Sequence, residues 1–227
     1  FLNLNNNRVL IFFMINTALR LIRDELADYL VDKKDITGLN DDDIIVSNIG
    51  LFESSNNNAV SERVVISLVN IEEETTLKNK PPLRKAGLTN TAIYENPPVF
   101  LNLYVLFSCN FTNGISTGDL YELSLLRLSY IIRFFQFKNS FEFSSSGRGS
   151  TVKDSDINDP DIRELKFTLE LYTLTFEQIN HLWGSLGGRQ MPFAMYKLRL
   201  VAITERIPLR EVPLIEEIET NLSPVMK

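Results

Sequence analysis

Apolar side chains recur at helical spacing near the start of the chain. From Met14 to about Leu30 they lie three or four residues apart, which predicts a helix with a single apolar stripe. Asn16 or Thr17 is the expected cap at its beginning, because a short polar side chain can accept a hydrogen bond from the first free amides. The stripe consists of Ile15, Leu19, Ile22, Leu26 and Leu30.

Two runs rich in β-branched residues come next. Residues 44–52 and 63–71 predict strands, and the polar stretch SSNNNAVSE between them suggests a hairpin with an exposed tip. Residues 76–98 then contain two Pro-Pro pairs and no periodicity, so a long loop is expected there. A second long loop is expected at about 139–160. Loops of this length are uncommon unless they bind something or are disordered.

The clearest strand covers residues 99–111. Its odd-numbered positions are almost all apolar, and its even-numbered positions mix Phe100, Tyr104 and Leu106 with polar residues. A strand that is apolar on both faces is typical of the centre of a sheet.

A long apolar helix follows this strand. Asp119 and Glu122 have the spacing of a capping box, which predicts a helix over residues 119–137. Its apolar positions exceed one narrow stripe, so we expect the sheet or another chain to cover it. These positions, with one arginine among them, are Leu123, Leu126, Arg127, Tyr130, Ile131, Phe134 and Phe137.

The C-terminal part alternates again. Residues 163–175 predict a strand with four leucine or phenylalanine side chains facing inward. Thr175 and Gln178 form a second capping box, which opens a helix from Phe176 to Leu186, and residues 193–204 predict the last strand. The inward residues are Leu165, Phe167, Leu169 and Leu171, and the outward ones are Lys166, Thr168, Glu170 and Tyr172.

The segment FEQINHLWGSLGG, residues 176–188, carries the only histidine and the only tryptophan of the chain. Ile179, Leu182, Trp183 and Leu186 fall on one helix face, and Gly187 stands where a left-handed residue ends a helix. The glycines follow the helix, whereas a phosphate site needs them before a helix N-terminus. The segment is therefore interpreted as a helix end that sets the path of a loop.

This order of elements favours a single α+β domain. We expect one mixed, mainly antiparallel sheet with helices packed on one face, long loops and terminal arms. Residues 1–13 are interpreted as an N-terminal extension or arm, residues 14–204 as the domain, and residues 205–227 as a C-terminal arm. The stretch 9–15, VLIFFMI, has no small-residue cleavage site after it and is too short for a membrane span, so a cytoplasmic chain is expected.

Composition limits the function classes. The formal net charge is −6, the wrong sign for a sequence-independent nucleic-acid binder, so no nucleic-acid partner is expected. Cys109 is the only cysteine, which permits neither an internal disulfide nor a multi-thiolate zinc site. A small buried apolar residue is the expected role for Cys109.

No stretch has the pattern of an active site, a metal site or a cofactor site. His181 has no second histidine as a co-ligand, and no G-x-S-x-G turn accompanies it as a general base. The consecutive Glu72, Glu73 and Glu74 cannot all point to one place. The acidic run Asp154, Asp156, Asp159 and Asp161 lacks the glycine and the closing glutamate of a calcium loop, and Asn110-Phe111-Thr112 matches a glycosylation acceptor that matters only after secretion.

Several stretches in order resemble one known family. They are MINTALRLIRDEL, VVISLVNIEEE, NPPVFLNLYVLFSCNF, LSYIIRFFQ, FEQINHLWGSLGG and MYKLRLVAI. Together they resemble the cap proteins of bacterial contractile injection systems, the tube-terminator subunits of the anti-feeding prophage and Photorhabdus virulence cassette type. The resemblance spans about residues 14–204.

This resemblance implies a fold like the tail terminators of contractile phages and a structural role without catalysis. Six copies would form a ring that ends the inner tube and holds the last layer of the sheath. The partners would be further copies of the chain, the inner tube protein and the sheath protein, with no insertion into a membrane. Assembly would take place in the cytoplasm, and the chain would then belong to an extracellular or cell-anchored particle. The candidate subunit, tube or sheath contacts are Phe134, Phe135, Phe137, His181, Trp183, Gly184, Gly187, Gly188 and Arg189.

Two alternatives remain open at this point. The chain could be an adaptor that links the terminator to an envelope or membrane anchor. It could also be a small hydrolase that uses Cys109 or a serine together with His181, although no pattern ties these residues together.

Overall fold

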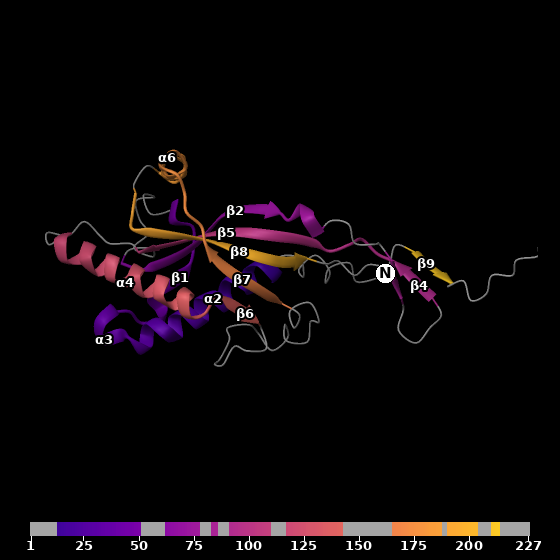
Figure 1. Cartoon of the computed structure of the whole chain (residues 1–227). Coiled ribbons are helices and arrows are strands. Elements are labelled where there is room, and N and C mark those ends of the chain that lie inside the picture. Colours follow the sequence, from indigo (N-terminus) through magenta and orange to yellow (C-terminus); the bar gives the residue numbers. More distant parts are fainter. Residues whose placement is uncertain are drawn as a thin grey trace, which may run out of the picture.

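A computed structural model provides the three-dimensional structure (Figure 1). It describes residues 13–50, 62–77, 83–85, 91–109, 117–142, 165–187, 190–203 and 210–213. The helices are α2 (Phe13–Asp32), α3 (Lys34–Thr37), α4 (Thr117–Phe137) and α6 (Phe176–Ser185), with short 3-10 turns η1 (Asp41–Asp43) and η3 (Thr75–Leu77). The strands are β1 (Ile44–Val46), β2 (Val64–Glu73), β3 (Leu83–Lys85), β4 (Thr91–Tyr94), β5 (Val99–Cys109), β6 (Ser140–Glu142), β7 (Lys166–Leu171), β8 (Phe193–Ile203) and β9 (Arg210–Pro213).

A six-stranded sheet in the order β1-β2-β5-β8-β7-β6 forms the centre of the molecule. All its neighbouring strands are antiparallel except β1 and β2, which are parallel. The mixed, mainly antiparallel sheet of an α+β protein is therefore confirmed. The central place predicted for the strand over 99–111 is also confirmed, because β5 pairs with β2 on one side and β8 on the other.

The hairpin expected between the first two strands is wrong. β1 is only three residues long and runs parallel to β2, with Ile44 opposite Val64. After Val46 the chain bends: the Asn48 side chain accepts a hydrogen bond from the amide of Gly50, at 2.9 Å. A tight turn can join only antiparallel strands, so the parallel register rules out a hairpin whatever path residues 51–61 take.

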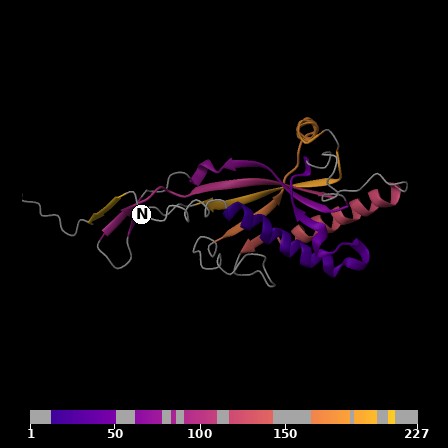
Figure 2. The same ribbon diagram turned by 180° about the vertical axis from the view of Figure 1, so that it is seen from behind.

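The two long helices cover one face of the sheet, and α6 covers part of the other face (Figures 1 and 2). On the first face, Leu103, Val105, Phe107 and Cys109 of β5 are buried beneath α2 and α4. On the second face, Leu106 of β5 lies in a smaller core with side chains of α6. The expectation of helices on one face thus holds for α2 and α4 only. Because β5 is apolar on both faces, the second face of the sheet also has to be shielded from water, and α6 covers part of it.

Aromatic rings fill the core between α4 and the sheet. Phe107 of β5 lies 4.8 Å from Phe135 of α4, measured between ring centroids, and Phe135 lies 4.7 Å from Tyr196 of β8. Phe141 of β6 stacks on Phe167 of β7 at 5.5 Å. These contacts fix α4 against the middle of the sheet.

A second, three-stranded sheet in the order β3-β4-β9 lies beyond the ends of β5 and β8 (Figure 1). The segment 76–98, expected to be a loop, therefore contains two short strands. Only residues 95–98 separate β4 from β5. The chain thus has two sheets rather than one, and the smaller sheet projects from the main body as an arm. The secondary structure of this arm was not evident from the sequence because its strands are only three or four residues long.

The remaining differences between the predicted and the observed elements concern where helices and strands begin and end. Asn16 and Thr17 lie inside α2 and Asp119 lies inside α4, so none of them is an N-cap. β6 lies in the segment expected as a loop over 139–160, while residues 143–160 lie outside the described residues. The N-terminal extension over 1–13, apart from Phe13, also lies outside them, as does the C-terminal arm over 205–227 except for β9.

Candidate assembly surfaces

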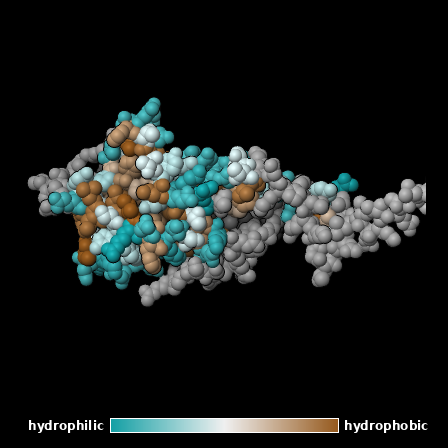
Figure 3. Space-filling view, viewed as in Figure 1, coloured by the Kyte–Doolittle hydropathy of each residue, from teal (hydrophilic) through white to brown (hydrophobic). Residues whose placement is uncertain are grey.

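The outer face of α4 carries a stripe of apolar side chains. Tyr121, Leu125, Leu128 and Ile132 follow one another at steps of four, three and four residues, which places them on one side of the helix, with Leu128 half-buried against the core. Tyr121 is 46% exposed and Leu125 and Ile132 are each 40% exposed. Figure 3 shows apolar side chains gathered over this part of the molecule. We call these four residues the α4 stripe.

A pocket of about 410 Å³ adjoins the α4 stripe. One wall is formed by Tyr121, Leu125 and Leu128, and the other by the segment that leads into β8. The second wall consists of Gln190, Met191, Pro192 and Phe193. The lining residues carry no formal charge, and the second wall includes Met191 and Phe193, which also belong to the core beneath α6.

From the sequence, the contact surface of α4 was expected elsewhere on the helix, at Phe134, Phe135 and Phe137. Phe134 and Phe135 are buried in the subunit's own core, with 4% and 3% exposed. Phe137, in contrast, is 85% exposed at the end of α4. Of these three residues, only Phe137 therefore stays a candidate for a contact with another chain. Phe134 and Phe135 instead pack α4 against the sheet. The α4 stripe itself was missed, although its spacing of four, three and four is visible in the sequence.

The capping box predicted for α6 is confirmed. The Thr175 hydroxyl accepts a hydrogen bond from the Gln178 amide at 3.3 Å, and the Gln178 side chain accepts one from the Thr175 amide at 2.9 Å. The cap fixes the start of α6, where Phe176 is 89% exposed. Leu171, at the end of β7, is 59% exposed, which contradicts its expected inward position. Leu171 is the last residue of β7, where it pairs with Tyr196 of β8.

The rare residues of α6 face opposite ways. Trp183 is 5% exposed, and its ring lies 5.4 Å from that of Phe193 in an edge-to-face contact. Its Nε1 has no hydrogen-bond partner among the described residues. His181 is exposed, and its Nε2 lies 3.8 Å from Oε1 of Glu177, one turn earlier on the helix. Of the two, only His181 is available to a neighbouring subunit without rearrangement.

Among the glycines at the end of α6, Gly187 has a clear backbone role. Gly187 has φ = 111°, the left-handed region expected for the residue that ends the helix. A side chain at Gly184 would meet nothing within 4 Å, so Gly184 lies on the open side of α6. Gly188 and Arg189 lie outside the described residues.

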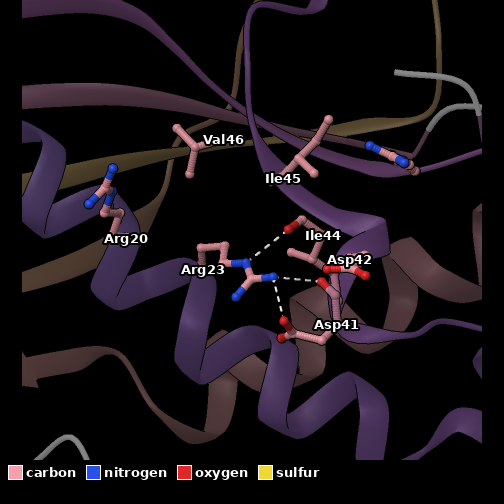
Figure 4. Close-up of a pocket in the computed structure, with 8 residues that line it drawn as sticks. Arg20, Arg23, Asp41, Asp42, Ile44, Ile45 and Val46 are labelled. Atoms are coloured by element: carbon pink, nitrogen blue, oxygen red, sulfur yellow. Dashed lines mark hydrogen bonds and ion pairs between the residues drawn. The ribbon is translucent and has the colours of Figure 1, made fainter. Parts of the chain in front are cut away.

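An arginine-lined pocket of about 750 Å³ lies at the β1 edge of the large sheet (Figure 4). Arg23 of α2 donates from Nε to the carbonyl of Ile44 at 2.9 Å, and from Nη2 to the Asp41 carboxylate at 2.8 Å. Arg20 and Arg63 line the same pocket, as does Asp42, so both signs of charge are present. Arg23 thereby forms a hydrogen bond with a carbonyl on the open edge of β1. This bond hinders the pairing of that edge with another strand.

Beyond α6, the second face of the large sheet carries a network of charged and polar side chains. Tyr104 donates to Oε2 of Glu72 at 2.6 Å, which lowers the pKa of Glu72 and raises that of Tyr104. Lys197 lies 3.5 Å from the same Glu72 oxygen. Arg199 lies 3.8 Å from Glu74 and 3.6 Å from Glu170.

Glu72 and Glu74 thus point to the same face and each has its own partners. The sequence predicts that the three consecutive glutamates cannot all point to one place, but it does not show which partners each of them has. The cross-strand partners of this network could not be assigned without the register of β2, β5 and β8.

The structure does not bring together Cys109 and His181, one of the catalytic pairs considered in the enzyme alternative. Cys109 is fully buried in the core beneath α2 and α4, and burial raises its pKa to about 12. His181 projects to solvent from α6 on the other face of the sheet. Within the part of the chain that the structure describes, no three His, Cys, Asp or Glu side chains are grouped so as to hold a metal ion. The acidic run from Asp154 to Asp161 and Asn110 lie outside that part.

None of the helices in the described ranges is long and apolar enough to span a membrane.

The chain matches a family model and resembles several solved structures, two of which are as follows. The first structure is titled an extracellular contractile injection system, PVC sheath/tube terminator in the extended state. It is 10% identical, with a TM-score of 0.47 over 72% of this chain and 50% of that chain. The second is titled the anti-feeding prophage cap (AFP tube terminating cap). It is 13% identical, with a TM-score of 0.46 over 86% of this chain and 62% of that chain. The chain thus covers between half and two thirds of the length of these proteins, and no curated protein matches it.

The family match covers most of the chain. The family described as the Pvc16 N-terminal domain matches residues 17–217, which include every element from α2 to β9 apart from the first turn of α2. The chain therefore belongs to the Pvc16 N-terminal domain family.

Proposed function

We propose that this chain is a structural cap of a phage-tail-like contractile injection system. Six copies form a ring that ends the inner tube and anchors the last sheath layer. Its partners are further copies of itself, the tube protein and the sheath protein, and it performs no catalysis. It assembles in the cytoplasm and then belongs to the finished particle, which is extracellular or cell-anchored.

Membership of the Pvc16 N-terminal domain family over residues 17–217 carries this proposal. The six sequence segments that resemble cap proteins all fall within or overlap this range. Residues 14–204 form the cap domain in this proposal, and the small sheet that includes β9 belongs to an arm. The net charge of −6 disfavours a nucleic-acid partner.

The surfaces of the molecule support a role in assembly. Large apolar side chains are exposed on both sides of the six-stranded sheet, at the α4 stripe and Phe137 on one side and at Phe176 on the other. A ring subunit needs two different surfaces, because each copy contacts two neighbours through different faces. The arm of β3, β4 and β9 offers a further projection toward the tube or the sheath.

Electron microscopy of the purified protein tests the proposal. Negative-stain images should show closed rings, and mass photometry should give a species of six subunits. In a strain that lacks this gene, particles should lose their uniform tube length, because nothing ends tube growth. Monomers at all concentrations, together with particles of normal length in that strain, would contradict the proposal.

A further inference from the structure

α6 is attached to the rest of the subunit by one of its sides only. Trp183 is its single buried residue. Three half-buried residues beside it reach the same small core: Ile179, Leu182 and Leu186. Within the described ranges, no hydrogen bond or ion pair joins α6 to the sheet, because its side chains bond only within the helix or to its cap. Apolar contact therefore holds α6 on the second face.

The side chain that anchors α6 contains a buried donor without a partner. Nε1 of Trp183 is shielded from solvent and has no hydrogen-bond partner among the described residues. Water would satisfy this donor whenever α6 leaves the sheet, so the closed position forfeits one hydrogen bond. The ring itself packs well, edge to face with Phe193. Trp183 therefore holds the helix less firmly than an apolar ring of the same shape would.

The core beneath α6 is small. Among the described residues it has six buried members, Trp183 included, far fewer than the core beneath α2 and α4. An element with few buried apolar contacts opens at a lower free energy than the fold as a whole. A helix of ten residues is also marginal by itself in water, so α6 loses its helical hydrogen bonds when it leaves the sheet.

Two residues beneath α6 also line the pocket beside the α4 stripe. Met191 and Phe193 form part of the wall of this pocket, and both belong to the core that Trp183 completes. The Phe193 ring contacts the Trp183 ring directly, and Met191 is flexible enough to repack when a neighbour leaves. A change in the position of α6 therefore changes the wall of the pocket.

We propose that α6 is a lid that opens as a unit from the second face, and that its opening loosens the pocket wall at Met191 and Phe193. The rest of the fold stays closed, because α2, α4 and the larger core lie on the other face. Since lid and pocket share a wall, a group that fills the pocket also shifts the lid, as linked equilibria require. The lid is a property of the subunit itself and does not depend on a ring.

Hydrogen exchange of the purified protein measures the opening. After correction for intrinsic rates, the amides of residues 179–186 should share one rate and one dependence on low urea concentrations. This rate should exceed that of the β5 amides by at least about a hundredfold. The amides of α4 are the control and should exchange as slowly as those of β5. A graded series of rates from the ends of α6 would show fraying instead, and exchange of α6 at the β5 rate would show no lid; either result overturns the proposal.

An isosteric replacement of Trp183 tests the role of the unpaired donor. The chain has one tryptophan, so expression with 3-benzothienylalanine exchanges this ring alone for one in which sulfur takes the place of the N–H. The closed lid should then be more stable, and exchange of the α6 amides should slow by about tenfold, while the β5 amides keep their rate. Equal or faster exchange of α6 overturns the role assigned to Nε1.

A cross-link that holds α6 closed tests the link to the pocket. A Cβ atom at Gly50 would lie 3.7 Å from Cδ2 of Leu186, so Gly50→Cys with Leu186→Cys can be joined by a short bis-maleimide. Cys109 is buried and does not compete for the reagent. Oxidation of Met191 by dilute hydrogen peroxide should be at least about fivefold slower in the cross-linked protein than in the same double variant capped with N-ethylmaleimide. Equal oxidation rates would show that the wall moves without the lid and overturn the coupling.

Discussion

Cys109 and His181 lie on opposite faces of the six-stranded sheet. The thiol is enclosed beneath α2 and α4, whereas the imidazole projects into solvent from α6. A nucleophile and its general base need hydrogen-bond contact, which a whole sheet between them prevents. The form of the enzyme alternative that pairs Cys109 with His181 is therefore excluded by the architecture itself.

The burial of Cys109 predicts an unreactive thiol. At pH 8 the folded protein should not react with a thiol reagent such as DTNB, because burial raises the pKa to about 12 and the sulfur is inaccessible. After unfolding in guanidinium chloride, one thiol per chain should react with DTNB. Rapid reaction of the native protein would show that the strand end at Cys109 opens to solvent.

Arg127 is predicted to be a structural link between three elements. From α4 it donates to the carbonyls of Thr37 and Glu62, each at 3.0 Å, and burial lowers its pKa. Arg127→Met keeps most of the apolar stem but leaves both carbonyls without this donor, which should cost roughly 2–4 kcal/mol of unfolding free energy. Urea denaturation measures this loss. Arg133→Met, at an exposed position of the same helix, serves as the control and should change stability by less than about 0.5 kcal/mol.

The lowered pKa of Glu74 predicts that the fold loses stability in acid. Hydrogen bonds from Asn102 and from the side chain and amide of Thr76 lower its pKa from 4.5 to about 2. Because the pKa is lower in the folded state, ionised Glu74 stabilises the fold above about pH 4.5, and this contribution disappears as the pH falls toward 2. The melting temperature of Glu74→Gln should therefore lie below that of the unaltered protein at pH 7, and the two should converge near pH 2.

The hydrogen bond from Asn102 can be tested separately. Asn102→Ala removes the largest cause of the shift, so it should raise the pKa of Glu74 in a carbon-detected NMR titration. An unchanged titration midpoint would argue that Thr76 and Arg199 are sufficient to keep the pKa of this carboxylate low.

Trp183 and His181 should respond differently to substitution. Trp183→Ala removes a buried ring from the core beneath α6 and should cost about 3–5 kcal/mol, measured by denaturant unfolding. Loss of rings in that variant would therefore report on folding as well as on contact. His181→Ala should leave stability within about 0.5 kcal/mol, because the side chain is exposed and its pairing with Glu177 is long. Any effect of His181→Ala on rings would then be assigned to an intersubunit contact.

The sequence alone determined the elements whose signals are local. The stripe of α2, the two-faced apolar pattern of β5, the capping box at Thr175 and the glycine turn at Gly187 each depend on residues within one or two turns of each other. Local backbone preference and side-chain spacing are sufficient for such features, so their positions were predicted within a few residues. The resemblance to cap proteins likewise rests on contiguous segments.

Only the tertiary structure decided how these elements meet. The parallel pairing of β1, the separate sheet of β3, β4 and β9 and the placement of α6 on the second face depend on contacts between residues far apart in the chain. The same holds for the surfaces: Phe134 and Phe135 are core residues and Leu125 is exposed, although all three read as apolar positions of one helix. A sequence pattern shows that a helix is apolar, but which side is buried depends on where the sheet lies, and that is settled by long-range packing.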